Sequence, residues 1–165
     1  MKLKFICNSI ERLNNLLGKL SSFLLFSLVL LVSFSVILRY IFSIGFTWLQ
    51  DLYIWIHACS ILLGIAYTLN KDNHVRIDIV FRNLTLGKRK KINLFGSIFF
   101  GLPFSLLLIS KGYEYYHRSF LLGENSKETG GLPNIFILKF FIFFMGILLF
   151  FELINKILKF ISKND

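Results

Sequence analysis

Four long apolar stretches, separated by short polar segments, form the main pattern of this chain. Three of them, 20–38, 52–70 and 92–110, contain no Asp, Glu, Lys or Arg. Each has about 19 residues, which as a helix span the ~30 Å hydrocarbon core of a bilayer. The fourth, 135–156, carries Lys139 near one end and Glu152 near the other. The pattern predicts four transmembrane helices.

We therefore expect an all-α integral membrane protein with a single membrane domain that covers 1–165. The side chains of Lys139 and Glu152 are expected to extend toward water at the membrane surfaces. Between the second and third helices, the apolar positions of 77–84 lie on one side, which predicts a short helix in the cytoplasmic interface. The transmembrane helices are expected at about 20–42, 48–69, 90–110 and 135–157.

Positive charge is distributed unevenly between the ends of these helices. Most of the 19 Lys and Arg lie in 1–19, in the polar segment 70–91 and in the tail 156–165. Basic residues accumulate on the cytoplasmic side of membrane proteins, so we expect both termini in the cytoplasm. This topology and contact with anionic membrane lipids explain most of the net charge of +10. We therefore expect no nucleic-acid partner.

Small residues recur on two of the predicted helices, where they allow close contact between helices. Ser97, Gly101 and Ser105 occupy every fourth position of the third helix, and Ser60 and Gly64 do the same in the second. Two interpretations remain open. These residues pack within this four-helix domain, or they pack against another membrane subunit.

Ionisable residues within the apolar stretches are few. Only His57 lies well inside one, and we interpret it as a hydrogen-bonding residue rather than a proton relay. No carboxylate is predicted in mid-membrane to bind a coupling ion, so the chain is not expected to form a substrate pathway alone. The spacing of Cys7 and Cys59 fits neither a zinc site nor a redox motif. We expect no catalytic residue, metal site or cofactor in this chain.

A polar and aromatic group lies at the expected outer boundary. If the second helix begins near Thr47, a candidate N-cap, then Trp48, Asp51 and Trp55 share one face. One interpretation is an aromatic belt with Asp51 beside a helix N-terminus. The other adds an ion pair between Arg39 and Asp51, or a docking surface for an external partner.

The order and placement of these residues resemble the small membrane subunit of tripartite ATP-independent periplasmic (TRAP) transporters. The resemblance covers about 38–133. One departure concerns Gln50-Asp51, where the family often has two consecutive acidic residues, so no role of a paired carboxylate carries over. The matching segments are Arg39-Tyr40-Ile41-Phe42, Trp48 followed by Asp51, Gly64-Ile65-Ala66, His74-Val75-Arg76-Ile77-Asp78, Ser126, Glu128 and Gly130-Gly131-Leu132-Pro133.

The resemblance implies a sodium-coupled uptake system of the bacterial inner membrane. In such a system a periplasmic binding protein captures an organic acid and delivers it to the membrane complex. A large permease subunit holds the substrate and sodium sites, and the small subunit packs beside it as a scaffold without enzymatic activity. The candidate structural and interface residues are Arg39, Trp48, Asp51, Trp55, Gly64, His74, Arg76, Asp78, Ser97, Gly101, Ser105 and Pro133.

The run 74–78 has two interpretations. In the first, it holds the end of the second helix against the interfacial helix, with Asp78 accepting hydrogen bonds from His74 or Arg76 or capping the short helix. In the second, it is a solvated loop whose charges only set the topology. Thr85 is expected to cap the third transmembrane helix.

Two other functions remain as alternatives. A self-contained small four-helix transporter would act as a homodimer, but it predicts a membrane-embedded Glu in the first helix, and 20–38 contains none. A membrane assembly protein without a transport partner is the other alternative.

Overall fold

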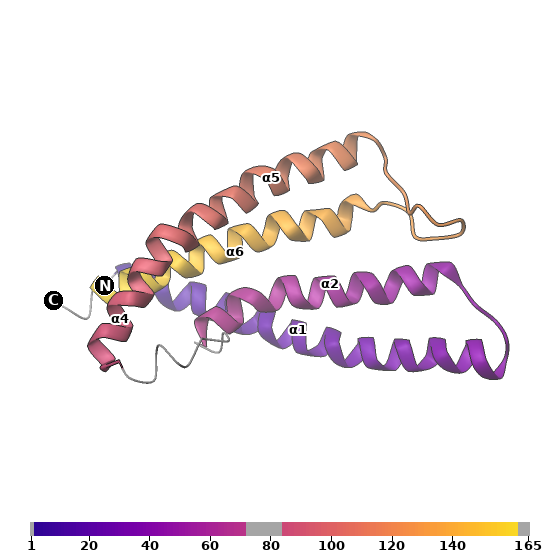
Figure 1. Ribbon diagram of the computed structural model, residues 1–165, viewed down its shortest axis with the longest axis horizontal. Helices are drawn as coiled ribbons and strands as arrows, with labels where there is room; N and C mark the ends of the chain where they lie inside the picture. Colours follow the sequence, from indigo (N-terminus) through magenta and orange to yellow (C-terminus); the bar gives the residue numbers. More distant parts are fainter. Residues whose placement is uncertain (1, 72–83, 162–165) are drawn as a thin grey trace.

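A computed structural model describes residues 2–71 and 84–161, which form helices joined by loops (Figure 1). Within these two ranges there is no strand. Four helical stretches are long and apolar enough to cross a membrane, as the sequence predicted: Cys7–Ile41, Thr47–Asn70, Gly87–Leu121 and Phe136–Ile161. The helices are α1 (Lys2–Ile41), α2 (Thr47–Asn70), α4 (Leu86–Gly96), the π-helical turn η1 (Ser97–Gly101), α5 (Leu102–Leu121) and α6 (Phe136–Ile161).

The helices pair as two antiparallel hairpins, α1 with α2 and α5 with α6, and α2 packs against α6 to join them (Figure 1). A small core forms where α1, α2 and α6 meet, from Leu17, Leu63, Ala66 and Leu148. The start of α1 and the end of α6 lie at one end of the bundle, which we call the inner end (Figure 1). Their cytoplasmic orientation stays a prediction.

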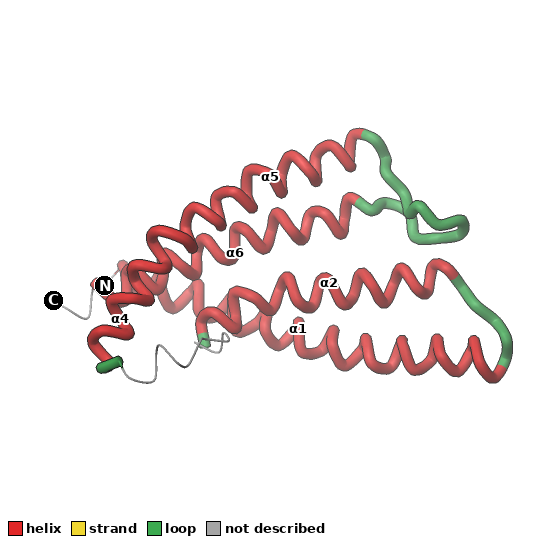
Figure 2. The backbone as a smooth tube through the Cα atoms, in the orientation of Figure 1, coloured by secondary structure: helices red, strands yellow, loops and turns green. Residues whose placement is uncertain are grey.

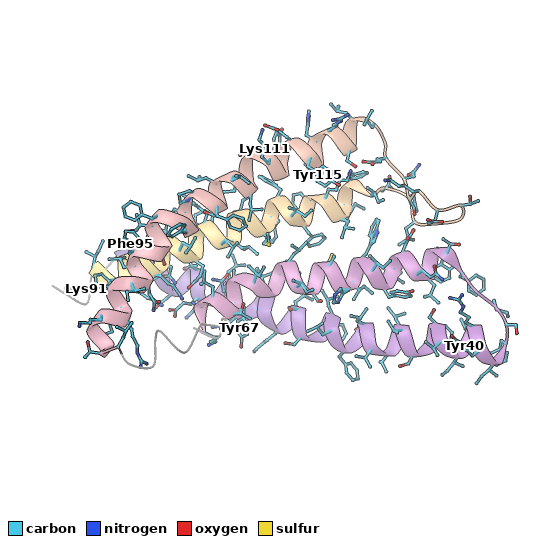
Figure 3. The ribbon with its side chains drawn as sticks, viewed as in Figure 1. Tyr40, Tyr67, Lys91, Phe95, Lys111 and Tyr115 are labelled. Carbon is cyan, nitrogen blue, oxygen red and sulfur yellow. The ribbon has the colours of Figure 1, made fainter. Side chains whose placement is uncertain are left out.

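The loops 42–46 and 122–135 lie at the opposite end, which we call the outer end (Figure 2). Tyr40 lies there, whereas Lys91 lies at the inner end (Figure 3). The first loop begins where Ser43 adopts a positive φ of 54°, and the second where Gly123 has a φ of 55°. These left-handed conformations cannot continue an α-helix, so they end α1 and α5.

Most large apolar side chains of α1 and α5 point outward, among them Phe23, Phe26, Phe104 and Leu107. Such exposure would be costly in water, but hydrocarbon is as apolar as these side chains. The bundle therefore has its apolar surface outside and its few polar contacts inside, as expected for a helical membrane protein.

Two helices are longer than the spans expected from the sequence. Helix α1 begins at Lys2 and has 40 residues, which gives it a length of about 60 Å, twice the hydrocarbon thickness. Its first half remains helical and packs on the bundle through Cys7, Asn14 and Leu17, which are buried. Helix α5 continues past the expected end to Leu121 because its later turns pack on α6, where Tyr116 contacts Phe140 edge to face.

The third membrane stretch contains a π-helical turn immediately before Pro103. Proline has no backbone N–H, so one hydrogen bond of a regular α-helix is absent there, and a widened turn is a common accommodation. The expected threonine caps do not form side-chain hydrogen bonds. Thr47 is the first residue of α2, with Phe46 at the N-cap, and Thr85 occupies the N-cap of α4 without a side-chain bond.

Two expectations lie outside the described residues. They are the interfacial helix at 77–84, apart from its last position, and the run 74–78 with His74, Arg76 and Asp78.

Glycines allow the α5–α6 hairpin to pack at close range. A Cβ atom added at Gly112 would lie 2.9 Å from the backbone Cα of Phe143, and one at Gly146 would lie 3.0 Å from the backbone N of Ile109. Because both neighbours are main-chain atoms, neither can move aside as a flexible side chain would. Each helix therefore presents a glycine to the backbone of the other.

We predict that Gly112→Leu destabilises the protein by about 1–3 kcal/mol, because the new side chain must push α5 away from α6. Thermal unfolding in detergent measures the effect. Gly96→Leu is the matched control, because a Cβ at Gly96 meets no atom within 4 Å. Equal melting temperatures for the two variants would show that close packing at Gly112 does not hold the hairpin.

Candidate assembly sites at the two ends of the bundle

A buried carboxylate connects three helices toward the inner end. Glu152 of α6 is only 1% exposed, which corrects the expectation that it reaches water. Asn14 of α1 donates from Nδ2 to Glu152 Oε2 at 2.6 Å, and Asn70 of α2 donates to Oε1 at 3.0 Å. Asn155, one turn further along α6, donates to Oε2 at 3.4 Å. We call these four residues the Glu152 cluster.

The geometry of the Glu152 cluster explains why the carboxylate is buried there. A carboxylate inside a protein is costly unless its oxygens accept hydrogen bonds. Both Glu152 oxygens accept, and the donors come from all three helices of the core. Separation of α2 would leave Oε1 without its donor, and separation of α1 would leave Oε2 with only the longer bond from Asn155. The cluster therefore ties α1, α2 and α6 together at one level.

An ion pair lies beyond the Glu152 cluster on two of the same helices. Lys159 of α6 pairs with Glu11 of α1, and both side chains are partly exposed. Exposed ion pairs contribute little to stability. This pair therefore adds to the alignment of α1 and α6 more than to the free energy of folding.

The predicted small residues lie at contacts within this chain. On α2, Ser60 is fully buried and its backbone oxygen accepts a hydrogen bond from Ser21 Oγ of α1 at 2.6 Å. A Cβ added at Gly64 would lie 2.8 Å from the same Ser21 Oγ. These residues bring α1 and α2 together.

The stripe on the third membrane stretch faces α6. A Cβ added at Gly101 would lie 2.9 Å from Leu153 Cδ2, and Ser105 is fully buried. Ser97, at the start of η1, is half-buried. The structure thus places Gly101 and the neighbouring stripe against this chain's own helix.

At the outer end, Asp51 connects α2 to the loop between α5 and α6. Its Oδ2 accepts a hydrogen bond from the backbone N–H of Leu132 at 2.8 Å. The loop is closed on itself by the bond from Ser126 N–H to Leu132 C=O at 3.1 Å. Gly131 has no room for a Cβ, which would collide with Asp51 and with Ser126. A larger residue at this position would have to displace the Asp51 carboxylate and the Ser126 side chain.

The other predicted residues at the outer end are not joined to Asp51. In the described parts of the chain, no ion pair links Arg39 to Asp51, and Arg39 is exposed at the end of α1. Trp48 is exposed and lies 5.8 Å from Phe46, ring centre to ring centre. Trp55 is half-buried, and Pro133 is exposed in the loop.

A second polar contact holds the other side of the same loop. Lys139 of α6 forms an ion pair with Glu124, and Ser119 Oγ donates to Glu124 at 2.6 Å. The Lys139 ammonium lies 4.1 Å from the centre of the Tyr115 ring, whose side chain lies between α5 and α6 in Figure 3. The hydrogen bond from Lys139, followed by that from Ser119, lowers the pKa of Glu124 below its ordinary value.

We predict that the Glu152 variants lose stability in a graded order. Glu152→Gln keeps one acceptor oxygen, whereas Glu152→Leu leaves three amides without an acceptor and should cost about 1–3 kcal/mol more. Thermal unfolding in detergent gives the order. Glu114→Gln is the control, because Glu114 is an exposed carboxylate that, within the described residues, pairs with Lys111 alone, one turn away. If Glu152→Leu melts like the unsubstituted protein, the cluster does not hold the helices.

The lowered pKa of Glu124 predicts a pH dependence with a definite sign. A carboxyl group whose pKa falls on folding contributes stability above its unfolded pKa, and loses it as the pH falls through the folded pKa. The difference in melting temperature between the unsubstituted protein and Glu124→Gln should therefore be present at neutral pH and close on acidification. Glu128→Gln, which removes an exposed carboxylate from the same loop, is the matched control for the loss of charge. A gap that is constant with pH would disprove the role of the ion pair.

The chain matches the family described as tripartite ATP-independent periplasmic transporters, DctQ component, over residues 28–163. It is 25% identical over 121 residues to the C4-dicarboxylate TRAP transporter small permease protein DctQ of Vibrio cholerae serotype O1 (strain ATCC 39315 / El Tor Inaba N16961). That alignment covers 73% of this chain and 51% of the relative, so the chain spans about half the length of this curated protein. No solved structure matches the chain.

The family match includes part of α1 and all of α2, α5 and α6, so most of the two hairpins lies within the matched region. Together with the four membrane-spanning helices, it identifies a multi-pass protein of the bacterial inner membrane. The chain belongs to the DctQ component family of tripartite ATP-independent periplasmic transporters.

Proposed function

We propose that this chain is the small permease subunit of a sodium-coupled TRAP transporter for an organic acid. It serves as a scaffold for the large, substrate-translocating subunit and works with a periplasmic substrate-binding protein. The Vibrio relative is named for C4-dicarboxylates. We propose the broader class, organic acids, for this chain.

The observation that supports a scaffold is that the bundle is tied at both ends. The Glu152 cluster joins α1, α2 and α6 toward the inner end, and Asp51 joins α2 to the outer loop. A subunit that moved its own helices apart to carry a substrate would have to break these contacts in every cycle. A fixed bundle suits a support against which another subunit moves.

The use of the buried polar groups supports the same proposal. Within the described residues, Glu152 is the one fully buried carboxylate, and both its oxygens are taken by amides. The buried Ser21, Ser60 and Ser105 donate to backbone carbonyls. We therefore assign the substrate and sodium sites to the large subunit, and no cofactor to this chain.

Reconstitution tests the proposal. The chain is co-expressed with a candidate large permease from the same genome, purified through a tag on this chain, and placed in liposomes. We expect the large subunit to co-purify, and uptake of a labelled organic acid to require both subunits, the binding protein and an inward sodium gradient. Uptake by this chain alone would instead show a self-contained transporter, and failure to co-purify would favour an assembly protein.

A further inference from the structure

We propose that the outward face of α2 formed by Ile54, His57 and Ile61 is the surface on which the large permease subunit packs, with the His57 ring hydrogen-bonded to that subunit. This inference rests on the proposed function, because it names the contact face of the same partner. Three observations support it: His57 lies near mid-span, its side chain is exposed, and its ring makes no bond to the described residues.

His57 lies near the middle of the membrane span. It is about ten residues from the start of α2 at Thr47, which places it roughly 15 Å along a helix that must cross ~30 Å of hydrocarbon. Its side chain is exposed on the bundle surface. Its ring has no hydrogen bond, ion pair or ring contact with any residue in 7–71 or 84–161, although its backbone oxygen accepts a bond from Ser60 Oγ at 2.7 Å.

The neighbours of His57 define a narrow strip on α2. Ile54, three residues earlier, is 53% exposed, and Ile61, four residues later, is 48% exposed. These spacings place all three side chains on one face of the helix. The opposite face of α2 carries Ser60, Leu63 and Ala66, which are buried against the rest of the bundle. The strip therefore points away from this chain.

The chemistry of imidazole makes lipid a poor neighbour for this strip. A neutral imidazole has one N–H donor and one acceptor nitrogen, and hydrocarbon satisfies neither. Ionisable residues inside membranes almost always face protein or a water-filled cavity. His57 faces neither within the described parts of this chain, so a second polypeptide is the neighbour that satisfies it.

Among the described residues, no other imidazole is exposed near the middle of a membrane helix. On α5, His117 is exposed, but it stacks on Tyr113 and lies four residues before the helix ends at Leu121. The exposed Lys111 and Glu114 of α5 pair with each other.

On α1, the outward residues around Phe26 and Val29 are apolar, and Ser27 donates to the Phe23 carbonyl of its own helix at 3.0 Å. On α5, Ser110 likewise donates to the Leu107 carbonyl at 3.1 Å. The α1 face around Phe26 suits lipid, whereas the α2 strip presents an imidazole near mid-span without a bond to the described residues. The occupant of the strip should supply a hydroxyl, amide or carboxylate at the depth of His57, between apolar residues that pack on the two isoleucines.

Photo-crosslinking locates the occupant. A photoreactive phenylalanine derivative is incorporated at Ile54 or Ile61, and at Phe26 on α1 as control, in cells that also express the large permease. We expect crosslinks to the large permease from positions 54 and 61, and none from position 26. A complex that co-purifies without a crosslink at 54 or 61, or with crosslinks only between copies of this chain, would overturn the face while leaving the proposed function intact. Absence of any complex would overturn both.

Substitution of His57 tests the hydrogen bond. His57→Leu should reduce the amount of co-purified large subunit about threefold or more, the effect expected for loss of one hydrogen bond between membrane helices. His57→Gln keeps a donor and an acceptor and should restore most of it, and Ser27→Leu on α1 should have no effect. The isolated His57→Leu protein should melt no lower than the unsubstituted one, because the ring makes no bond to the described residues. Full retention of the large subunit by His57→Leu would overturn the proposal.

Discussion

The structure depends on the buried Glu152 carboxylate, because membrane helices need polar bonds between them to stay together. Lipid is as apolar as leucine, so burial of apolar surface does not drive membrane helices together. Close contact between small residues and a few polar bonds must do so instead. Here glycines hold each hairpin, and the Glu152 cluster joins α1 and α2 to α6. Without it, the two hairpins would share mainly a small apolar core.

The two ends of the bundle use different chemistry for the same purpose. Toward the inner end a buried carboxylate accepts from side-chain amides, whereas at the outer end Asp51 accepts from a backbone N–H. The backbone contact needs a loop of fixed shape, which Gly131 and the Glu124–Lys139 pair provide. Both kinds of contact convert pairs of helices into one unit, which is what a static support requires.

The membrane spans could be predicted because uncharged apolar runs long enough to cross a bilayer are typical of transmembrane helices. Helix ends were harder to predict, because the start of α1 and the end of α5 are helical although they lie outside the uncharged apolar runs. Glu152 was misplaced because periodicity alone does not say which side of α6 faces the bundle. Asn155 at the next turn, with Asn14 and Asn70 on two other helices, was the available signal. The bond from Leu132 N–H to Asp51 had no signal in the sequence, because almost every residue has a backbone N–H.

The length of α1 has a mechanical consequence. Its 40 residues contain no proline, and about 30 Å of the helix extend beyond the hydrocarbon. A tilt of about 10° within the membrane would move the far end of such a rod by about 5 Å. Because Asn14 and Glu11 fasten it to α6, the two helices would move as one. A change in bilayer thickness, which alters helix tilt, would therefore be transmitted as a sideways displacement at the inner surface.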